Sequence, residues 1–80
     1  MDIQKTVAKR LVSLCNQYYI SMNQLATKSG VPPSTVKNII YGKSKNPGIA
    51  TIKMLCDGFG ITLGEFFSTP EFDDLAQEIK

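Results

Sequence analysis

Apolar side chains recur at intervals of three and four residues along most of this 80-residue chain. Such spacing puts them on one side of an α-helix, where they can pack against a core. The apolar runs and the breaks between them predict five helices, at residues 2–18, 22–29, 33–41, 49–59 and 63–67, and a short sixth helix that starts near residue 70. We therefore expect an all-α fold.

One side of each predicted helix is expected to face the core, and Val31 is expected to join it from a turn. The inward residues, in chain order, are Ile3, Val7, Leu11, Leu14, Cys15, Tyr18, Leu25, Ala26, Val36, Ile39, Ile40, Ile49, Ile52, Leu55, Cys56, Phe59, Leu63, Phe66, Phe67, Phe72, Leu75, Ala76 and Ile79. Tyr18 and Tyr19 are expected at the edge of the core. The apolar positions after residue 70 fit equally well a cover for this core or a surface that pairs two chains.

Several helix ends carry recognisable signals. Ser21 is expected to cap the second helix, with Gln24 reaching back to the amide of Ser21 in a capping box. Gly30 is expected to end that helix. Pro33 suits the first position of the third helix, because that position needs no amide donor. Thr62 is expected to cap the fifth helix.

Residues 22–41 have the spacing of two short helices that cross at a sharp angle. Ala26 supplies the small side chain that the crossing requires, and Gly30 supplies a turn residue that tolerates positive φ. Val31, Val36 and Ile39 point inward from the turn and the second helix. This arrangement is a helix-turn-helix, whose second helix can enter the major groove of DNA.

Length and composition narrow the class of protein. Eighty residues form one domain, and no run of about 18 apolar residues is present to span a bilayer. The first residues lack the charged-then-apolar order of a signal peptide, so we expect a cytoplasmic protein. Without His or a Cys-x-x-Cys pair there is no zinc ligand set. Cys15 and Cys56 are expected to be buried free thiols, since a reducing compartment disfavours a disulfide, and no cofactor is expected.

The net charge of +2 conceals a strong asymmetry. Residues 1–53 carry eight Lys and Arg against one Asp, a charge of +7, whereas residues 54–80 carry one Lys against six acids, a charge of −5. Residues 21–53, which include the helix-turn-helix, contain five lysines and no acid. Such a segment fits a polyanionic partner. On charge alone, an ordinary solvated lysine surface is an equally good interpretation.

With these landmarks in one register, residues 11–67 resemble the lambda repressor/Cro-like helix-turn-helix family, also called the xenobiotic-response-element family. The shared positions are Leu25, Ala26, Gly30, Val31, Ser34, Thr35, Val36, Ile39, Gly42, Lys43, Asn46, Pro47, Thr51, Leu55, Gly60, Ile61, Leu63, Glu65 and Phe67. The resemblance implies a compact five-helix domain at residues 1–68 that binds specific duplex DNA sequences in transcriptional control. Residues 69–80 would be an amphipathic extension that packs on the domain or mediates dimerisation.

The chain departs from the family pattern at three places. Met22 stands where members often have a Gln that holds the phosphate backbone and braces the recognition helix. Pro32 replaces a common Ser or Thr cap. Pro33 replaces an Arg or Gln that often reaches a base. Asn23 or Gln24 would have to take over the role of the missing Gln, and the strongest hydrogen-bonding side chain at the helix tip is absent.

The outer side of the third helix supplies the candidate base contacts. They are Pro33, Ser34, Thr35 and Asn38. Asn38 is the strongest candidate because its amide can pair with adenine N6 and N7, which is worth about 1–3 kcal/mol of discrimination. The Pro33 ring and the Thr35 methyl can pack against a thymine methyl. The alternative for Asn38 is an ordinary solvent-exposed helix residue.

Candidate contacts to the DNA backbone surround that helix. They are Asn23, Gln24, Lys28, Lys37, Tyr41, Lys43, Lys45 and Asn46. Lysines and exposed amides position a protein on phosphates without reading sequence. Each phosphate that is neutralised steepens the log–log salt dependence of binding by about 0.9. Lys53 is expected to be a solvated charge only.

The expected partner is double-stranded DNA. A homodimer is expected to bind it, with its two recognition helices in successive major grooves about 34 Å apart. No enzymatic role is expected, since catalytic pairs and phosphate-cradling loops are absent from the sequence. No membrane partner is expected. No small-molecule effector is expected either, because the DNA-binding fold uses all 80 residues of this sequence. Two alternatives remain. The first is a protein-interaction module that keeps the fold without reading DNA. The second is the antitoxin of a toxin–antitoxin pair, which still binds DNA and has a protein partner on its C-terminal face.

Overall fold

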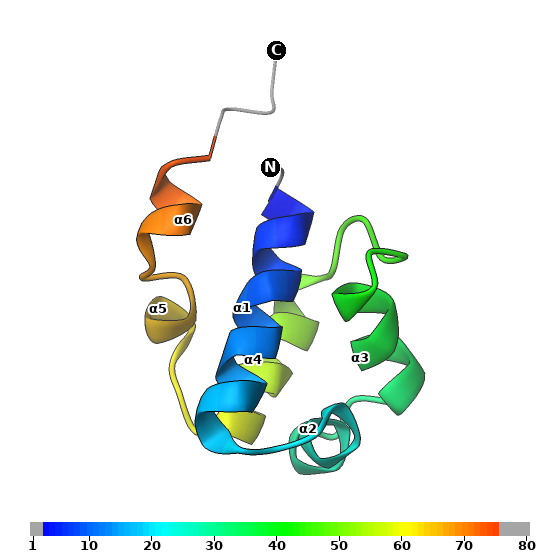
Figure 1. Cartoon of the computed structure of the whole chain (residues 1–80). Helices are drawn as coiled ribbons and strands as arrows, with labels where there is room; N and C mark the ends of the chain where they lie inside the picture. Colours follow the sequence, from blue (N-terminus) through cyan, green and yellow to red (C-terminus); the bar gives the residue numbers. More distant parts are fainter. Residues whose placement is uncertain (1–2, 76–80) are drawn as a thin grey trace.

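The computed structural model describes residues 3–75, which form six α-helices and no strand (Figure 1). The helices are α1 (Ile3–Tyr18), α2 (Met22–Ser29), α3 (Pro33–Ile40), α4 (Ile49–Phe59), α5 (Leu63–Phe66) and α6 (Pro70–Asp73). The all-α prediction is confirmed, and the ends of α1 to α5 agree with the predicted ones within one residue. The sixth helix begins at Pro70 as predicted but ends at Asp73, so the placement of Leu75 on this helix is wrong. Ala76 and Ile79, predicted to lie on the last helix, fall outside the described residues.

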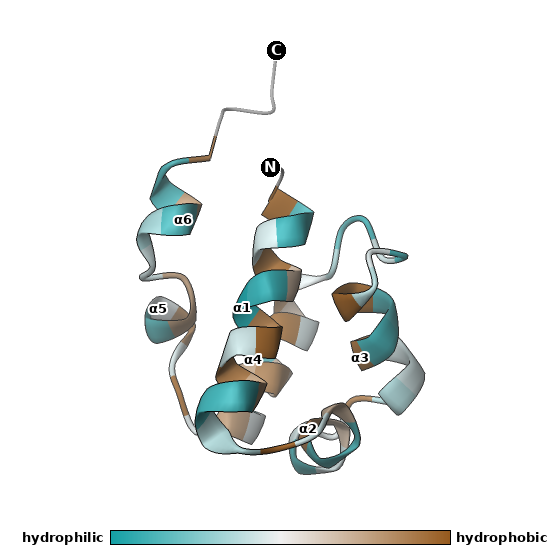
Figure 2. Cartoon of the chain, in the orientation of Figure 1, coloured by the Kyte–Doolittle hydropathy of each residue, from teal (hydrophilic) through white to brown (hydrophobic). Residues whose placement is uncertain are grey.

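The helices surround α1, which stands at the centre of Figure 1 with α4 behind it. α2 crosses the lower end of this pair, α3 stands on one side, and α5 and α6 lie on the other. Apolar residues concentrate where the helices face one another (Figure 2). The buried apolar core consists of Val7, Leu11, Leu14, Cys15, Leu25, Ala26, Val31, Val36, Ile39, Ile52, Leu55, Cys56, Phe59 and Phe66.

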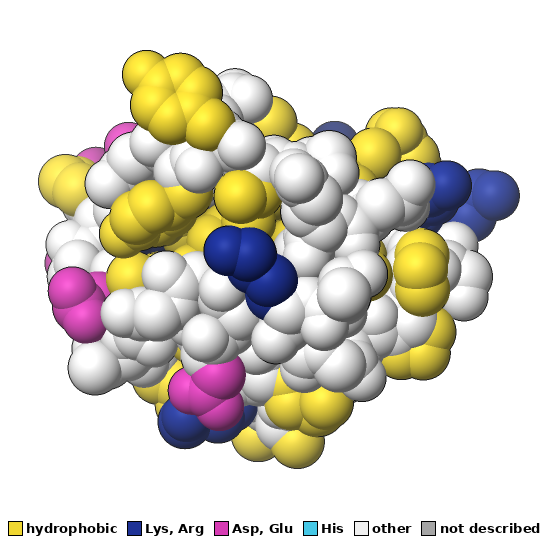
Figure 3. All heavy atoms as spheres, turned by 90° about the horizontal axis from the view of Figure 1, so that it is seen from below, with side chains coloured by type: hydrophobic (Ala, Val, Ile, Leu, Met, Phe, Trp, Pro, Cys, Tyr) yellow, Lys and Arg dark blue, Asp and Glu magenta, His cyan; other side chains and the backbone are white. Residues whose placement is uncertain are grey.

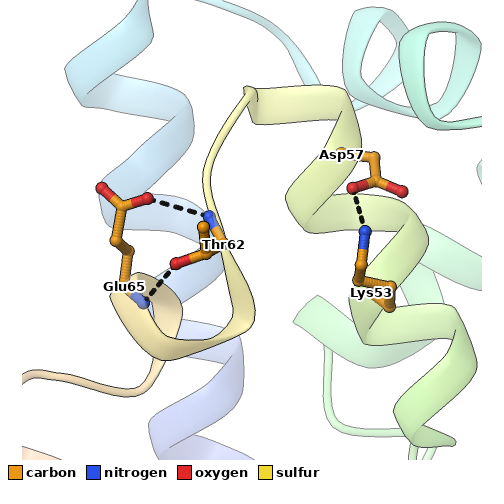
Figure 4. Close-up of polar contacts among 4 residues, drawn as sticks. All are labelled: Lys53, Asp57, Thr62 and Glu65. Carbon is orange, nitrogen blue, oxygen red and sulfur yellow. Dashed lines mark hydrogen bonds and ion pairs between the residues drawn. The ribbon is translucent and has the colours of Figure 1, made fainter.

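The predicted helix caps are confirmed. The Ser21 hydroxyl accepts from the Gln24 amide at 3.1 Å, and the Gln24 side-chain oxygen accepts from the Ser21 amide at 2.8 Å. Thr62 and Glu65 form the same reciprocal pair at the start of α5, with both distances 3.0 Å (Figure 4). Two capping boxes satisfy amides that a helix start leaves without internal partners.

Four residues that were predicted to be inside or at the core edge are exposed. Ile3 and Ile49 are 43% and 64% exposed, because each is the first residue of its helix and extends past the neighbours that cover the next turn. Tyr18 is 41% exposed, although its ring lies 5.9 Å from the ring of Phe59. Tyr19 is 93% exposed, so its predicted packing is wrong. Periodicity gives the direction of a side chain, not how far the neighbouring helix reaches.

Arg10 attaches α5 to α1. Its Nε donates to the Phe66 carbonyl and its Nη2 to the Glu65 carbonyl, both at 2.8 Å, and its guanidinium lies 5.9 Å from the Phe66 ring centroid. The last carbonyls of a helix have no internal partner, so the guanidinium acts as a cap from another helix. Arg10 therefore holds α5 against α1.

The close approach of α2 and α4 depends on a glycine. A Cβ atom added at Gly58 would lie 2.9 Å from Cβ and 3.2 Å from Cα of Ser29. Only a residue without a side chain leaves room for the backbone of α2 at that crossing. Gly58 thus sets the depth at which the first helix of the helix-turn-helix sits on the core.

Candidate DNA-binding site

The helix-turn-helix consists of α2, a short turn and α3, at one end of the molecule (Figure 1). Gly30 adopts φ +73°, and its amide donates to the Ala26 carbonyl at 2.9 Å. The Val31 amide donates to the same carbonyl at 3.2 Å, and Val31 is buried. The predicted inward roles of Ala26, Val31, Val36 and Ile39 are all confirmed.

The start of α3 is bounded by two exposed prolines. Pro32 occupies the cap position and makes no side-chain cap hydrogen bond, while Pro33 is the first helical residue, as predicted. The Pro32 carbonyl accepts from the Thr35 amide at 3.0 Å and from the Val36 amide at 3.2 Å. The tip of α3 therefore presents pyrrolidine rings and the exposed Ser34, not a long hydrogen-bonding side chain.

The outer side of α3 is polar and solvent-exposed. Ser34, Lys37 and Asn38 are exposed, Tyr41 is 65% exposed just past the helix end, and Thr35 is half-buried at the edge. The structure thus brings the predicted base-contact residues together along one side of one helix. Opposite them, Val36 and Ile39 are buried, which fixes the rotation of α3 about its axis.

The end of α3 is a tight, hydrogen-bonded turn. Gly42 adopts φ +81°, its amide donates to the Ile39 carbonyl at 3.3 Å, and the Lys43 amide donates to the Asn38 carbonyl at 2.9 Å. These two bonds are the pattern of a Schellman motif. They direct the loop that follows, so that the exposed side chains of Lys43, Lys45 and Asn46 continue from the end of α3.

The other predicted backbone contacts lie on α2. Asn23, Gln24 and Lys28 are exposed and line one shallow hollow with Thr27. The side-chain oxygen of Gln24 is engaged in the capping box, which leaves its NH₂ group as a donor for a phosphate. Met22, at the position of the missing Gln, is half-buried and packs against the core.

Gln4 is a residue near the site that the sequence interpretation missed. It is 6% exposed, and its Nε2 donates to the Ile39 carbonyl at 3.5 Å. A Cβ atom added at Gly42 would lie 3.4 Å from the same nitrogen. Gln4 therefore contacts α3 where the helix ends. The available signal was a polar residue on the inward stripe of α1, next to Ile3 in the chain.

Charges are distributed unevenly around this end of the molecule. Figure 3 views the molecule from below: the edge on the α3 side carries lysine or arginine side chains and no visible acidic ones, whereas acidic side chains lie toward the opposite side. Further lysine or arginine side chains lie at the centre of this face and at its lower edge, the latter beside an acidic group. Lys53 is exposed to solvent, as predicted, and forms a surface ion pair with Asp57 one turn further along α4 (Figure 4). Near α6, hydrogen bonds from the Glu71 backbone and the Thr69 side chain lower the pKa of the Glu71 carboxyl.

Other kinds of site find no support within residues 3–75. No group of His, Cys, Asp or Glu among them is arranged to hold a metal ion. Cys15 and Cys56 are free and buried, as predicted, and burial raises the pKa of both thiols. None of the described helices is both long enough and apolar enough to cross a bilayer.

Known proteins resemble the chain in sequence and in structure. A family model described as helix-turn-helix matches residues 11–66. The HTH-type transcriptional regulator PuuR of Escherichia coli (strain K12) is 35% identical over 71 residues, 89% of this chain and 38% of PuuR, and PuuR of Shigella flexneri gives the same values. The chain thus spans well under half the length of these curated relatives.

A solved structure agrees with the same assignment. The crystal structure of the prophage Lp1 protein 11 is 32% identical to this chain and superposes with a TM-score of 0.81, covering 92% of this chain and 97% of that one. The family model also spans more than half of the chain, from α1 to α5. The chain belongs to the lambda repressor/Cro-like helix-turn-helix family of DNA-binding proteins.

Proposed function

We propose that this protein is a sequence-specific regulator of transcription that acts as a repressor by placing α3 in the major groove of duplex DNA. The observation that carries the proposal is the outer side of α3, where Ser34, Lys37 and Asn38 stand exposed in a segment, residues 21–53, that contains no acid. The family and the similarity to a transcriptional regulator support it.

Base reading would be shared among four neighbouring residues. Asn38 would pair with adenine through both groups of its amide, for about 1–3 kcal/mol of discrimination. Pro33 and Thr35 would pack against thymine methyl groups, and Ser34 would contact a base or phosphate with little preference. With no Arg or Gln at the helix tip, discrimination would rest mainly on Asn38.

Backbone contacts would lie on both sides of this helix. The proposed contacts are Asn23, Gln24 and Lys28 from α2, and Lys37, Tyr41, Lys43, Lys45 and Asn46 from the end of α3 and its loop. Side chains of this kind set register and orientation on the duplex. A single recognition helix reads few base pairs, so we propose a homodimer whose two α3 helices meet successive major grooves.

Selection from a randomised duplex pool tests this function directly. The protein is incubated with the pool near physiological salt, and the bound duplexes are sequenced. Enrichment of a palindrome is the expected result. Salt-sensitive retention without enrichment would contradict sequence-specific reading, and absence of retention at any moderate salt would contradict DNA binding altogether.

Asn38→Ala then tests the assignment of the base reader. We expect discrimination between the selected sequence and its adenine-substituted variants to fall by about 1–3 kcal/mol, with little change in binding to unrelated duplexes. Gln17→Ala is a suitable control, because Gln17 is an exposed amide on α1 that is not among the proposed DNA contacts. Unchanged discrimination in Asn38→Ala would remove Asn38 from the site.

A protein-interaction module, or an antitoxin with a protein partner, is the second candidate. Met22 packs against the core where the family often has a Gln that holds the DNA backbone, and Pro33 starts α3 where it often has an Arg or Gln that reaches a base. Both positions favour this candidate, as does Pro32, which makes no side-chain cap. Regulation in cells that survives combined replacement of Asn38 and Lys43 would favour this candidate. A partner seated on the C-terminal face, residues 69–80, would identify the antitoxin form.

A further inference from the structure

Two hollows lie next to each other between α1 and the C-terminal end of α3. Both are lined by Ala8, Lys9 and Ile40, so they form one continuous depression, which we call the α1–α3 groove. One end reaches Val12 on α1, and the other reaches Tyr41 and Lys45 beyond the end of α3. The groove therefore continues directly from residues of the proposed DNA-binding site.

The groove is positively charged in the part near Tyr41, and Lys9 lines both of its hollows. Lys5, Lys9 and Lys45 line it, all three are exposed, and among residues 3–75 no Asp or Glu lines it. Like charges gathered around one depression repel one another, and a polyanion in the groove would relieve that repulsion. Pairing two copies of the chain through this groove would instead bring the lysines of both copies together.

The position of the groove beside α3 indicates which polyanion it would bind, namely the phosphates of DNA. An α-helix with its side chains is about 10–12 Å across, close to the width of about 12 Å of the major groove, so the flanks of a recognition helix face the phosphates of the two strands. Successive helix residues are about 100° apart. Ile40 therefore lies about 160° round the axis from Asn38, on the side of α3 that faces α1. Tyr41, which also lines the α1–α3 groove, lies about 60° from Asn38 and marks the flank at which the groove opens beside the outer side of α3.

We propose that the α1–α3 groove is a second track for the DNA backbone, in which Lys9 and Lys5 of α1 bind phosphates together with Lys45. This inference rests on the proposed function, and it extends the contacts from the helix-turn-helix to α1. An acidic protein segment would match the charge equally well. Direct continuity with Tyr41 and Lys45, which flank the end of the recognition helix, favours the phosphates of the same duplex.

The salt dependence of binding tests the track. The affinity of the whole chain for a duplex of unrelated sequence is measured at several salt concentrations. Lys9→Ala is expected to lower the log–log slope by about 0.9, and Lys5→Ala with Lys9→Ala by about 1.8, because each lysine that leaves a phosphate releases one fewer condensed counterion. Lys9→Glu is expected to weaken binding further, by adding repulsion at the same place.

Lys53→Ala is the matched control. It removes the same unit of charge, but Lys53 pairs with Asp57 on α4 and lines neither hollow. Its slope is expected to equal that of the unchanged protein, and thermal unfolding confirms that each variant is folded. Equal slopes for Lys9→Ala and Lys53→Ala would overturn the track and leave the groove to an acidic protein segment. If the unchanged protein bound no duplex, the proposed function itself would fail, which is a separate result.

Discussion

Tyr19 shows strain at the scale of a single residue. Among residues 3–75 it is the non-glycine residue with positive φ, at +56°, and it follows the last residue of α1. The Ile20 amide donates to the Cys15 carbonyl at 3.0 Å across it, the helix-ending geometry that glycine normally serves. A residue with a Cβ atom meets its own carbonyl in this conformation, at a cost of about 1–2 kcal/mol.

Tyr19→Gly is therefore expected to stabilise the fold. The Tyr19 side chain is 93% exposed and has little packing to lose, so relief of strain should dominate, for a gain of about 0.5–1 kcal/mol. Urea unfolding followed by circular dichroism measures the change. Tyr19→Ala is the control, because it removes the ring but keeps the Cβ atom. An equal gain in the alanine variant would show that the ring, and not the backbone, is the source of strain.

Some residue roles were predictable and others were not. Ser21 with Gln24 is a local signal, since both partners lie within one helical turn and their chemistry is sufficient to predict the cap. The hydrogen bonds of Arg10 join residues more than 50 positions apart, so nothing near Arg10 in the chain predicts them. The hydrogen bond from Gln4 to the Ile39 carbonyl likewise joins residues that are far apart in the chain. Roles that depend on distant backbone groups require the packed structure.

At the scale of an element, the position of α2 depends on the absence of a side chain at Gly58 in α4. Ala26 was expected to be the small residue of the helix crossing, and it is buried. Gly58 provides the closer approach, because a Cβ atom there would overlap the side chain and backbone of Ser29. Gly58 lies inside α4, where sequence alone indicates only a poor helix former.

Gly58→Ala is expected to destabilise the protein by about 1–3 kcal/mol, because the gain in helix propensity is smaller than the cost of pushing α2 away. Equilibrium urea unfolding gives the free energy. Gly64→Ala is the matched control, since a Cβ atom there would lie 3.7 Å from the Thr62 hydroxyl, an ordinary contact. If Gly58→Ala were as stable as the unchanged protein, the crossing would have room that these distances do not show.

The attachment of α5 gives another prediction at this scale. Arg10→Lys keeps the charge but loses the planar fork that reaches the Phe66 and Glu65 carbonyls together. We expect a loss of about 1–3 kcal/mol, in line with hydrogen bonds from a charged donor. Thermal unfolding compares it with Lys9→Gln, a change at an exposed neighbour. Equal midpoints for the two variants would mean that Arg10 does not hold α5.

At the scale of the whole molecule, the charge asymmetry of the sequence becomes a separation in space. The acids after residue 54 include Glu65 on α5 and Glu71 and Asp73 on α6, which lie across α1 from α3. If α3 enters the major groove as proposed, the field of DNA would orient the molecule before contact, with α3 leading and α6 trailing. The C-terminal face would then point away from the DNA, where the proposed homodimer could use it.

The overall fold was largely predictable because its helices have local starts, local stops and a clear period. The predicted and described bounds of α4 agree at both ends, since Gly48 and Gly60 interrupt the chain on either side. The candidate site was predictable only as a face of α3. The rotation of α3 about its axis depends on the burial of Val36 and Ile39. The α1–α3 groove needs residues of α1 together with residues at the end of α3 and in the loop that follows, which are far apart in the chain.

Spacing of half-sites provides the test at this scale. If two α3 helices bind successive major grooves about 34 Å apart, inserting about half a helical turn of DNA between the half-sites moves one of them to the opposite face of the duplex. Simultaneous binding is then lost, and affinity is expected to fall by about 100-fold or more, because the second contact is no longer intramolecular. The same insertion outside the selected site should have no effect. Binding that tolerates the internal insertion would mean that each chain binds DNA alone. The affinity would then come entirely from the few base contacts of one α3 and the phosphate contacts of one chain.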